Sequence, residues 1–378
     1  MAAYLERGGR WQRSGTAVSV DSLNNVYVGG TTQNASGNDD LVILKYSAGG
    51  PDPDGTPLWA VTYNGTAEGA DQLYSLAAGI DGLAVTGQSW NGTSYDLLTI
   101  KYGLDGSNLW EKRYSSGAGY VCSGKQVKMD AGGNVIVSGT AANNLDLDIY
   151  TARYNGSTGS ILWEKTYNGA FNDEPNGLYV DNGGDVYVTG YTWTLSGTND
   201  FYTVRYASSN GAVVWQQNFD SGDGNTDVAI ATGIAVDEAG DVLVTGYTVT
   251  GGNYDFQTIK YKRDNGNQLW HSSFNGTAGK NDRPAGLGFS PAGDVLVGGW
   301  SDNGTDLDYY LIKYDAGAIN PPTSLATTTI SSTSIGLSWT DNSGNEEGFK
   351  IERKLGEQGT FAQIGVVGAG STTYTDEG

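Results

Sequence analysis

Carboxylates are the side chains best able to do chemistry in this chain, which has 42 Asp and Glu residues against 21 Lys and Arg. Three of them, Asp220, Asp223 and Asp227, lie in one short loop together with two glycines. This spacing lets several oxygens converge on a hard cation, so the loop is a candidate calcium site. It does not match the EF-hand pattern, and acidic loops rich in glycine are also common without metal. No motif in the sequence requires a cofactor.

Other catalytic chemistry has little support, because the chain has one histidine, His271, and one cysteine, Cys122. Neither a catalytic triad nor a zinc site can be assembled from them. His271 follows a tryptophan that recurs along the chain. The other copies are followed by Ala60, Glu111, Glu164 and Gln216, three of which are polar, so we expect His271 on a solvated strand. Cys122 is expected to be a buried, inert thiol. The remaining enzymatic alternative is a pair of carboxylates acting on a glycan.

One aspartate opens a predicted strand at regular intervals along the chain. A residue that recurs at the same place is expected to be structural, because a catalytic site needs its residues only once. We therefore expect these side chains to hydrogen-bond the backbone of the preceding loop, with a ring of calcium ligands as the alternative. The recurring residues are Asp40, Asp96, Asp148, Asp200, Asp255 and Asp308.

A second group of candidate residues is aromatic and does not recur in every repeat. We expect these side chains on loops that share one face of the protein, where they could stack on sugar rings or clamp a peptide. Packing over the gaps between neighbouring sheets is the alternative explanation. The candidate ligand-binding residues are Trp90, Trp193, Trp300, Tyr191, Tyr247 and Trp11, and Phe171, like Trp11, is expected in a loop between blades.

An internal repeat must position all of these groups. Three markers share one period, which is a strong signal of repetition. A glycine ends a strand-like run at spacings of 57, 52, 51, 56 and 53 residues, beginning at Gly30. A Lys/Arg-Tyr pair recurs at spacings of 56, 52, 52, 55 and 53, and a Leu/Val-Trp pair at 51, 53, 52 and 55.

Each repeat is predicted to contain four short antiparallel strands. The fifth unit shows them over residues 233–237, 241–248, 255–261 and 269–274, with alternating apolar residues and tight turns. Four-stranded units at this period are typical of an all-β propeller. We predict six blades over residues 1–317. The sixth lacks a Leu-Trp strand, so residues 3–7 are expected to close the ring and cover the exposed strand edge.

Several motifs resemble known propeller families. Residues 286–301 resemble the opening of a WD40 blade, and the recurring Asp-x-x-Gly-Asp/Asn-Val-Tyr-Val-Thr-Gly-Tyr-Thr pattern is similar to the bacterial repeats called SBBP. The segment Tyr-x-x-x-x-Gly-x-x-Leu-Trp is similar to the tryptophan-docking repeat of quinoprotein dehydrogenases. The adjacent cysteine pair of the alcohol dehydrogenases among them cannot be formed here. Each of these resemblances implies a β-propeller.

The C-terminal segment, residues 318–378, differs in pattern from the repeats. After Pro321-Pro322, the run around Trp339 and the strand Gly348–Arg353 resemble a fibronectin type III module. The 58 residues from Pro321 onward fall short of the ~90–100 that a seven-stranded sandwich needs. We therefore expect a partial fibronectin type III-like β-sandwich and a longer parent polypeptide.

The net charge of −21 argues against nucleic-acid binding, because such a surface repels phosphate. No stretch approaches ~18 consecutive apolar residues, so we expect no membrane insertion. The N-terminus has no apolar signal segment, and the composition favours a bacterial extracellular or cell-surface protein whose signal peptide is absent from this chain. The sequence favours a secreted, non-catalytic recognition or scaffold module for protein or glycan. The alternatives are the carboxylate enzyme and a purely structural spacer.

Overall fold

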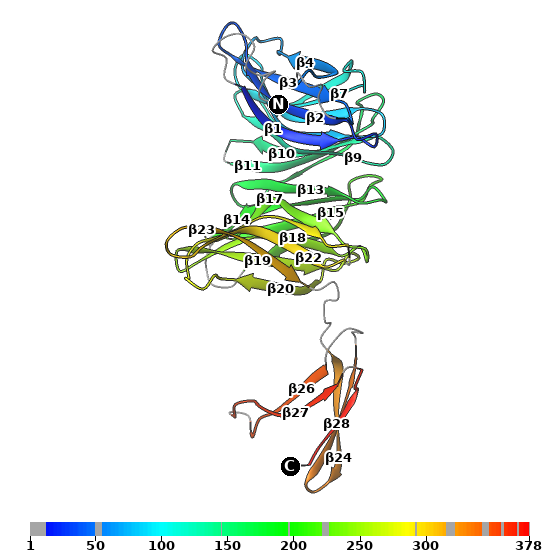
Figure 1. Ribbon diagram of the computed structural model, residues 1–378, viewed down its shortest axis with the longest axis vertical. Helices are drawn as coiled ribbons and strands as arrows, with labels where there is room; N and C mark the ends of the chain where they lie inside the picture. Colours follow the sequence, from blue (N-terminus) through cyan, green and yellow to red (C-terminus); the bar gives the residue numbers. More distant parts are fainter. Residues whose placement is uncertain are drawn as a thin grey trace. The chain divides into compact units, whose positions relative to one another are not determined.

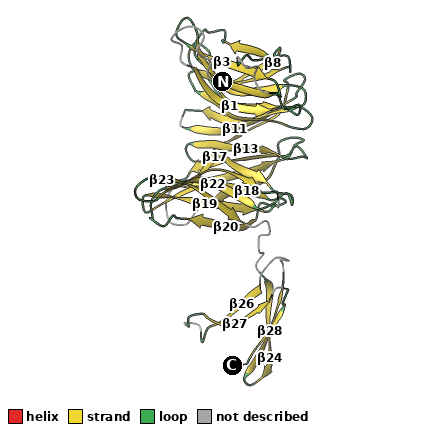
Figure 2. Cartoon of the chain, in the orientation of Figure 1, coloured by secondary structure: helices red, strands yellow, loops and turns green. Residues whose placement is uncertain are grey.

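The computed structural model describes residues 13–49, 55–144, 146–195, 197–220, 227–291, 293–314, 322–341, 348–356, 359–368 and 370–377. All regular structure within these residues is β-strand, as Figure 2 shows, and none of it is a helix that could cross a membrane. The chain divides into two compact units, one of Met1–Leu287 with Val297–Tyr310 and one of Gly288–Leu296 with Leu311–Gly378.

Five four-stranded antiparallel sheets make up most of the first unit, each with its strands in chain order. Consecutive sheets contact each other through their first strands, and Figure 1 shows them following one another along the chain. The first two sheets contain β1 (Arg13–Val20), β2 (Val26–Gln33), β3 (Asp39–Tyr46), β4 (Trp59–Tyr63), β5 (Asp71–Ala78), β6 (Leu83–Trp90), β7 (Tyr95–Tyr102) and β8 (Asn108–Tyr114).

The next three four-stranded sheets repeat this arrangement. They contain β9 (Cys122–Met129), β10 (Val135–Ala142), β11 (Leu147–Tyr154), β12 (Ile161–Tyr167), β13 (Asp173–Val180), β14 (Val186–Trp193), β15 (Asn199–Tyr206), β16 (Val213–Phe219), β17 (Asp227–Val236), β18 (Val242–Thr250), β19 (Asn253–Tyr261) and β20 (Gln268–Phe274). A three-stranded sheet follows, with β21 (Asp282–Phe289), β22 (Val295–Asp302) and β23 (Leu307–Tyr314). Residues 3–7, which we predict to be its fourth strand, lie outside the described residues.

The recurring glycine lies where the first strand of each sheet bulges toward the second. The register of β5 and β6 shifts between Leu73 and Ser75, next to Gly87. A Cβ atom on Gly87 would lie 1.8 Å from the carbonyl oxygen of Gln72, and one on Gly190 would lie 1.9 Å from that of Glu174. A side chain would therefore push the two strands apart, which explains why glycine recurs at this position.

The recurring tryptophan forms a hydrogen bond between its own sheet and the next one. The indole Nε1 of Trp110 donates a hydrogen bond of 2.9 Å to the carbonyl of Gly156 in the following sheet. Trp163 does the same to Ser208 at 3.1 Å, and Trp215 to Arg263 at 2.7 Å. Each ring lies beside a turn glycine with positive φ, such as Gly211 beside Trp163. The period of the Leu/Val-Trp pair is thus the period of the contact between sheets.

In the sheets after the first, the recurring Lys/Arg side chain pairs with the turn between the first two strands of its own sheet. Lys101 contacts Asp81 at 2.8 Å, Arg205 contacts Asp185 at 2.7 Å, and Lys260 contacts Asp237 at 2.8 Å. The apolar core lies between consecutive sheets, in clusters that contain the recurring tyrosines Tyr102, Tyr154, Tyr206 and Tyr261.

Strands of the second unit form two further small sheets. One contains β24 (Thr323–Ser331), β25 (Ser334–Thr340) and β28 (Thr373–Asp376), and the other contains β26 (Gly348–Arg353) and β27 (Ala362–Gly368). The ring of Trp339 is buried and lies 5.3 Å from that of Phe349. An apolar cavity of about 360 Å³ lies beside these two rings.

Candidate functional site

The aromatic candidates on the second strand of each sheet occupy two positions, one and three residues after the recurring glycine, which we call two levels of the strand. Trp193 lies two residues after Tyr191 on β14, so the two side chains share a face of the sheet. The strand ladders and the recurring glycine place Gln88, Thr140, Tyr247 and Trp300 at the level of Tyr191. They place Trp90, Ala142 and Val249 at the level of Trp193. Side chains at both levels therefore change from one sheet to the next.

Trp193 is the exposed tryptophan among the described candidates. Its side chain is 41% exposed, and Phe171, in the loop before β13, is 44% exposed. The two ring centroids are 5.9 Å apart, and the backbone N–H of Trp193 donates to the carbonyl of Asn172 at 3.0 Å. Leu195, two residues further on, is 86% exposed. We call Phe171, Trp193 and Leu195 the apolar patch.

Trp90 has a different environment from Trp193. It is half-buried, and its ring packs edge-on against Tyr95, the residue directly opposite on β7, at 5.2 Å. A Cβ atom on Gly69 would lie 2.2 Å from the Trp90 ring, so the loop before β5 also covers it. The ring of Trp90 is therefore partly covered by β7 and by the loop before β5. Trp300 is half-buried, and Trp11 lies outside the described residues.

The two candidate tyrosines take part in polar contacts. The hydroxyl of Tyr191 donates to Glu174 on β13 at 2.6 Å, and burial together with this carboxylate raises the pKa of Tyr191. Tyr247 packs edge-on against Tyr254 on β19 at 5.0 Å. The guanidinium carbon of Arg283, on β21, lies 3.7 Å from the ring centroid of Tyr254 and 4.5 Å from that of Tyr247.

A polar pocket of about 530 Å³ lies at the first two sheets, lined by Ser14, Thr16, Thr31, Asp39, Gln72, Leu73 and Tyr74. The hydroxyl of Tyr74 donates to the side-chain oxygen of Gln72 at 2.6 Å, and the side-chain amide of Gln88 donates to the same oxygen at 3.0 Å. The side-chain oxygen of Gln72 therefore already accepts two hydrogen bonds from the protein. Among the described residues that line the pocket, Asp39 is the one carboxylate, whereas glycan hydrolysis uses a pair.

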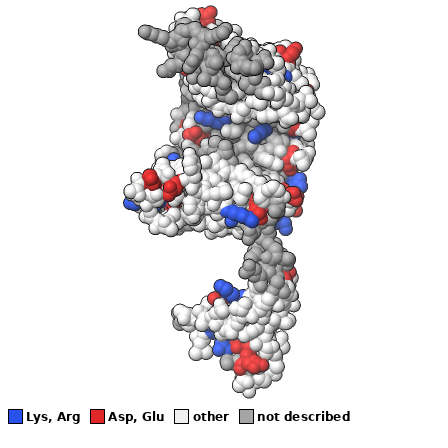
Figure 3. All heavy atoms as spheres, in the orientation of Figure 1, with Lys and Arg blue, Asp and Glu red and all other residues white. Residues whose placement is uncertain are grey.

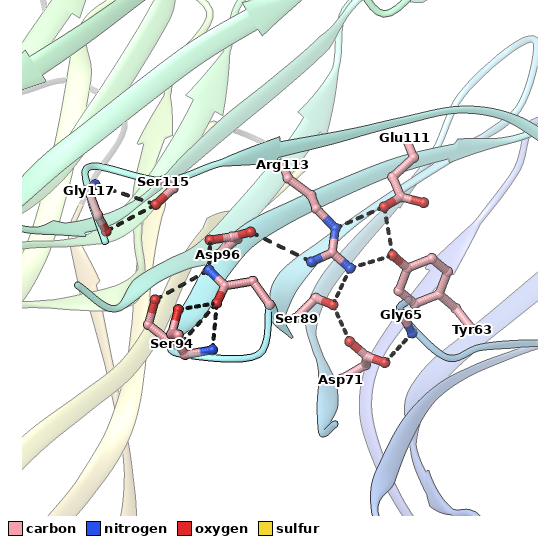
Figure 4. A network of polar contacts seen from close by, with 12 residues as sticks. Tyr63, Gly65, Asp71, Ser89, Ser94, Asp96, Glu111, Arg113, Ser115 and Gly117 are labelled. Atoms are coloured by element: carbon pink, nitrogen blue, oxygen red, sulfur yellow. Dashed lines mark hydrogen bonds and ion pairs between the residues drawn. The ribbon is translucent and has the colours of Figure 1, made fainter. Parts of the chain in front are cut away.

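A charged network joins the first sheet to the second (Figure 4). The guanidinium of Arg113 donates to Glu111 at 3.1 Å, to the hydroxyl of Tyr63 at 2.9 Å and to Ser89 at 2.6 Å. Ser89 in turn donates to Asp71, which accepts the backbone N–H of Gly65 at 2.6 Å. Because every polar side chain in this chain of contacts has a partner in the protein, we interpret the network as structural.

This network lies between the first and second sheets, at the position where a pair of stacked tyrosines joins each of the next two pairs of sheets. Tyr114 stacks on Tyr150 at 3.8 Å and Tyr167 on Tyr202 at 3.9 Å, each across two consecutive sheets. The residue that corresponds to Tyr150 in the second sheet is Leu98, which also lies opposite the recurring glycine. Between the first and second sheets, Tyr63 therefore makes polar contacts with Arg113 and Glu111 in place of the tyrosine stacking. Burial raises the pKa of the Tyr63 hydroxyl to about 12.

Four of the six recurring aspartates hold the loop before the third strand through an asparagine side chain of that loop. The side-chain amide of Asn91 donates to Asp96 at 2.6 Å, and the side-chain oxygen of Asn91 accepts the backbone N–H of Thr93 at 2.9 Å. The same amide-to-carboxylate bond joins Asn34 to Asp40, Asn143 to Asp148 and Asn303 to Asp308. We expected a direct bond to the loop backbone, and the asparagine bridges it instead.

A second set of recurring aspartates, at the start of the first strand, was missed by our sequence reasoning. Asp71, Asp173 and Asp282 are fully buried, and each accepts the backbone N–H of a preceding loop glycine. The sequence signal is an Asn-Gly pair a few residues before each aspartate, as in Asn64-Gly65 before Asp71. These carboxylates fix the loops between consecutive sheets, from which Phe171 projects.

The remaining candidates for chemistry do not form a catalytic set among the described residues. His271 is exposed on β20, and its ring lies edge-on to Phe219 at 5.3 Å. Cys122 is buried, with its sulfur 3.2 Å from the hydroxyl of Ser116. No group of three His, Cys, Asp or Glu side chains able to hold a metal occurs in the described residues. Asp223 and the side chain of Asp227 lie outside that part, so the calcium loop remains a prediction.

Similarity to known proteins is confined to the fold. No protein-family model matches the sequence, and no curated protein sequence does. The crystal structure of Sqt1 from Chaetomium thermophilum is 12% identical, with a TM-score of 0.50 over 87% of this chain and 80% of that one. A second Sqt1 structure has a TM-score of 0.48 over 97% and 86% of the two chains at 12% identity. BamB from Moraxella catarrhalis is 13% identical, with a TM-score of 0.40 over 96% and 91%.

The similarity to the first Sqt1 structure agrees with the repeated four-stranded sheets of this chain. The sequence repeats and the contacts between consecutive sheets have the same period. The chain is an all-β protein of repeated four-stranded antiparallel sheets, similar in fold to β-propeller proteins.

Proposed function

We propose that this chain is a non-catalytic binding module that takes a segment of a partner protein on its apolar patch. The observation that carries the proposal is the joint exposure of Phe171 and Trp193 at 44% and 41%, next to Leu195 at 86%. A cluster of large exposed apolar side chains is unusual on a soluble surface and marks sites of association. Tryptophan is also among the residues that contribute most to binding energy at protein interfaces.

A protein segment suits this patch better than a glycan does. A sugar ring needs hydrogen-bonding side chains at its edge as well as an aromatic face. The three side chains of the patch offer only the indole N–H, whereas an aliphatic or aromatic side chain of a peptide would bury the patch completely. Figure 3 shows acidic and basic side chains in separate spots on the face in view, without a continuous basic surface that would favour a nucleic acid.

We also propose that residues 1–317 form a closed ring of six blades in which residues 3–7 pair with β23. Apolar side chains left open at both ends of the series of sheets support this. Val18 of β1 is 65% exposed and Tyr309 of β23 is 100% exposed. The residues that correspond to Val18 in the following sheets are buried against the preceding sheet, and they are Leu76, Val127, Leu178 and Ile234.

The finer assignments rest on sequence patterns. We propose that the repeats are of the SBBP or WD40-like type and that residues 318–378 form an incomplete fibronectin type III-like sandwich. Two small sheets beside the buried Trp339 are compatible with the latter, since a full sandwich has seven strands. Such modules are common in exported bacterial proteins, so we propose an extracellular or cell-surface location.

The binding proposal is tested by selection on the folded chain. A library of displayed random peptides and a glycan array are offered to the protein in parallel, and peptides recovered from the library are measured by fluorescence anisotropy. We expect peptides with an apolar anchor, and we expect Trp193→Ala to weaken them by about tenfold to a hundredfold. Ile80→Ala is the matched control, because Ile80 is 73% exposed in the turn between β5 and β6.

Three outcomes would contradict the proposal: binding that survives Trp193→Ala, recovery of glycans but no peptides, or equal losses in Trp193→Ala and Ile80→Ala. Thermal melts of both variants separate a binding loss from a folding loss. Because Trp193 is exposed, we expect its truncation to shift the melting temperature little.

A further inference from the structure

Arg283 differs from the other arginines whose side chains the structure describes. Each of the others pairs with a carboxylate, as Arg205 does with Asp185 and Arg263 with Asp181. The remaining pairs are Arg113 with Glu111, Arg153 with Asp130 and Arg353 with Asp376. Within the described residues, Arg283 has aromatic contacts in place of a carboxylate. Carboxylates outnumber basic groups two to one in this chain, so an unpaired arginine is not explained by scarcity.

Two tyrosines from the neighbouring sheet hold this side chain in place. Its guanidinium carbon lies 3.7 Å from the ring centroid of Tyr254, which is the contact distance of stacked groups, and 4.5 Å from that of Tyr247. The two rings are themselves edge to face at 5.0 Å. Cation–π contacts of this kind fix the plane of a guanidinium without using its N–H groups. The hydrogen-bonding edge of Arg283 thus stays free.

The nitrogens of Arg283 differ in their access to solvent. Nε is buried and has no hydrogen-bond partner in the described part of the chain. The two terminal nitrogens are not among the buried, unpartnered atoms there, and no hydrogen bond joins them to a residue that the structure describes. A buried donor without a partner is costly, and a ligand that accepts from this guanidinium would offset that cost. This arrangement suits end-on, bidentate binding of a planar anion.

Arg283 also stands at a position that the repeat leaves free to vary. It follows Asp282, which has the recurring structural contact to a loop glycine, at 2.6 Å from the N–H of Gly276. The residues at the corresponding position of the other sheets vary in type, and none of them is basic. They are Ser14, Gln72, Ser123, Glu174 and Val228.

We propose that Arg283, held by Tyr247 and Tyr254, binds a carboxylate side chain of the same partner segment that the apolar patch anchors. This inference rests on the proposed function. Tyr191 and Tyr247 stand at the same position, one residue after the recurring glycine, on the second strands of two consecutive sheets that contact each other. Tyr191 lies two residues from Trp193 on β14. One extended peptide can therefore reach both the apolar patch and Arg283. Its remaining residues should be neutral or basic, because the chain carries a net charge of −21.

The test is a double-mutant cycle with the peptides selected above. We expect these peptides to carry an Asp or Glu at a fixed distance from the apolar anchor. Replacing that acid by its amide should weaken binding to the natural chain by about tenfold or more, the fold-change of one lost charged hydrogen bond. The same replacement should have no effect on Arg283→Gln, and Arg283→Lys should restore only part of the affinity. Arg353→Gln, which removes an exposed paired arginine, is the matched control and should behave like the natural chain.

A second measurement does not depend on peptide selection. The Nε–H signal of Arg283 in ¹⁵N-labelled protein is followed while N-acetyl-glutamate amide or inorganic phosphate is added. A shift with the carboxylate, absent in Arg283→Gln, supports the proposal, whereas a response to phosphate alone would overturn it. Selected peptides that depend on Trp193 but bind equally well as acid and amide would overturn the carboxylate site while leaving the proposed function standing. Loss of dependence on Trp193 would overturn the proposed function itself.

Discussion

Replacing Asp173 by Asn should stabilise the protein at neutral pH and not in acid. Asp173 begins β13 and is fully buried, where it accepts hydrogen bonds from the backbone N–H of Gly169 and the hydroxyl of Thr192. Burial raises the pKa of this carboxyl to about 6, although the two hydrogen bonds lower it, and Asp148 and Asp146 add to the increase. The folded chain therefore holds a proton on Asp173 at a pH where the unfolded chain has lost it.

The size of the effect follows from the difference between the two pKa values. The pKa of Asp173 is about 6 in the folded chain and 3.8 for the free side chain. At about 1.4 kcal/mol per pKa unit, the shift corresponds to roughly 3 kcal/mol of unfolding free energy. Because the folded pKa is raised, this contribution is fully present below the unfolded pKa. It is lost as the pH rises through the folded pKa, and it stays lost at higher pH.

Urea unfolding followed by tryptophan fluorescence measures the effect in Asp173→Asn. The amide can accept from Gly169 and donate to Thr192, so the variant keeps both contacts without the buried charge. Near pH 4 the two proteins should have similar unfolding free energies, and near pH 7.5 the variant should be more stable by up to ~3 kcal/mol.

Asp71→Asn is the matched control for this prediction. Asp71 has the same contact to a loop glycine, but Ser89 links it to the guanidinium of Arg113. Loss of its charge should therefore bring no gain at neutral pH. A difference between Asp173→Asn and the natural chain that stayed constant from pH ~4 to ~7.5 would refute the assignment of a raised pKa to Asp173. So would a variant that was less stable at neutral pH.

Two further predictions concern the scaffold. Gly211→Ala should cost about 2–4 kcal/mol in urea unfolding, because Gly211 has a φ of +67° and its new methyl group would lie 2.7 Å from the Trp163 ring. Gly197→Ala, at φ +85° with no atom within 4 Å, should cost only about 1 kcal/mol, and equal losses would contradict the role of the Trp163 contact. Deleting residues 1–9 should lower the melting temperature by several degrees if residues 3–7 cover β23, and an unchanged melt would rule out that closure.

The repeated sheets could be predicted from the sequence because each period marker has a physical cause. The glycine marks the bulge of the first strand, where a Cβ atom on Gly87 would lie 1.8 Å from a carbonyl oxygen. The tryptophan marks the hydrogen bond to the next sheet, as from Trp110 to Gly156. The basic residue before the tyrosine marks an ion pair within its own sheet, as from Lys101 to Asp81. Each of these three contacts joins residues that are separated by about the same number of residues in every repeat, so the contacts recur with the period of the sequence.

The contacts that occur once could not be predicted in this way. Arg113 meets Tyr63 although 50 residues separate them, and Arg283 meets Tyr247 across two sheets. No spacing rule links these pairs, because each exists in one place only. The recurring first-strand aspartates were a signal in the sequence that we overlooked, since their loop glycines lie at unequal distances, six residues before Asp71 and four before Asp173.

Trp90 and Trp193 show that the same position of the repeat can be covered in one sheet and exposed in another. The two residues occupy the same level of corresponding strands, and the sequence alone gave them the same role. The residue directly opposite Trp90 is Tyr95, whose ring covers the indole, whereas Asn199 stands opposite Trp193 and is too small to do so. Among the described residues, the aromatic ring beside Trp193 is that of Phe171, from the loop before β13, and Phe171 is itself exposed. A repeat fixes where an aromatic residue stands, and its cross-strand partner then decides whether that residue is covered or exposed.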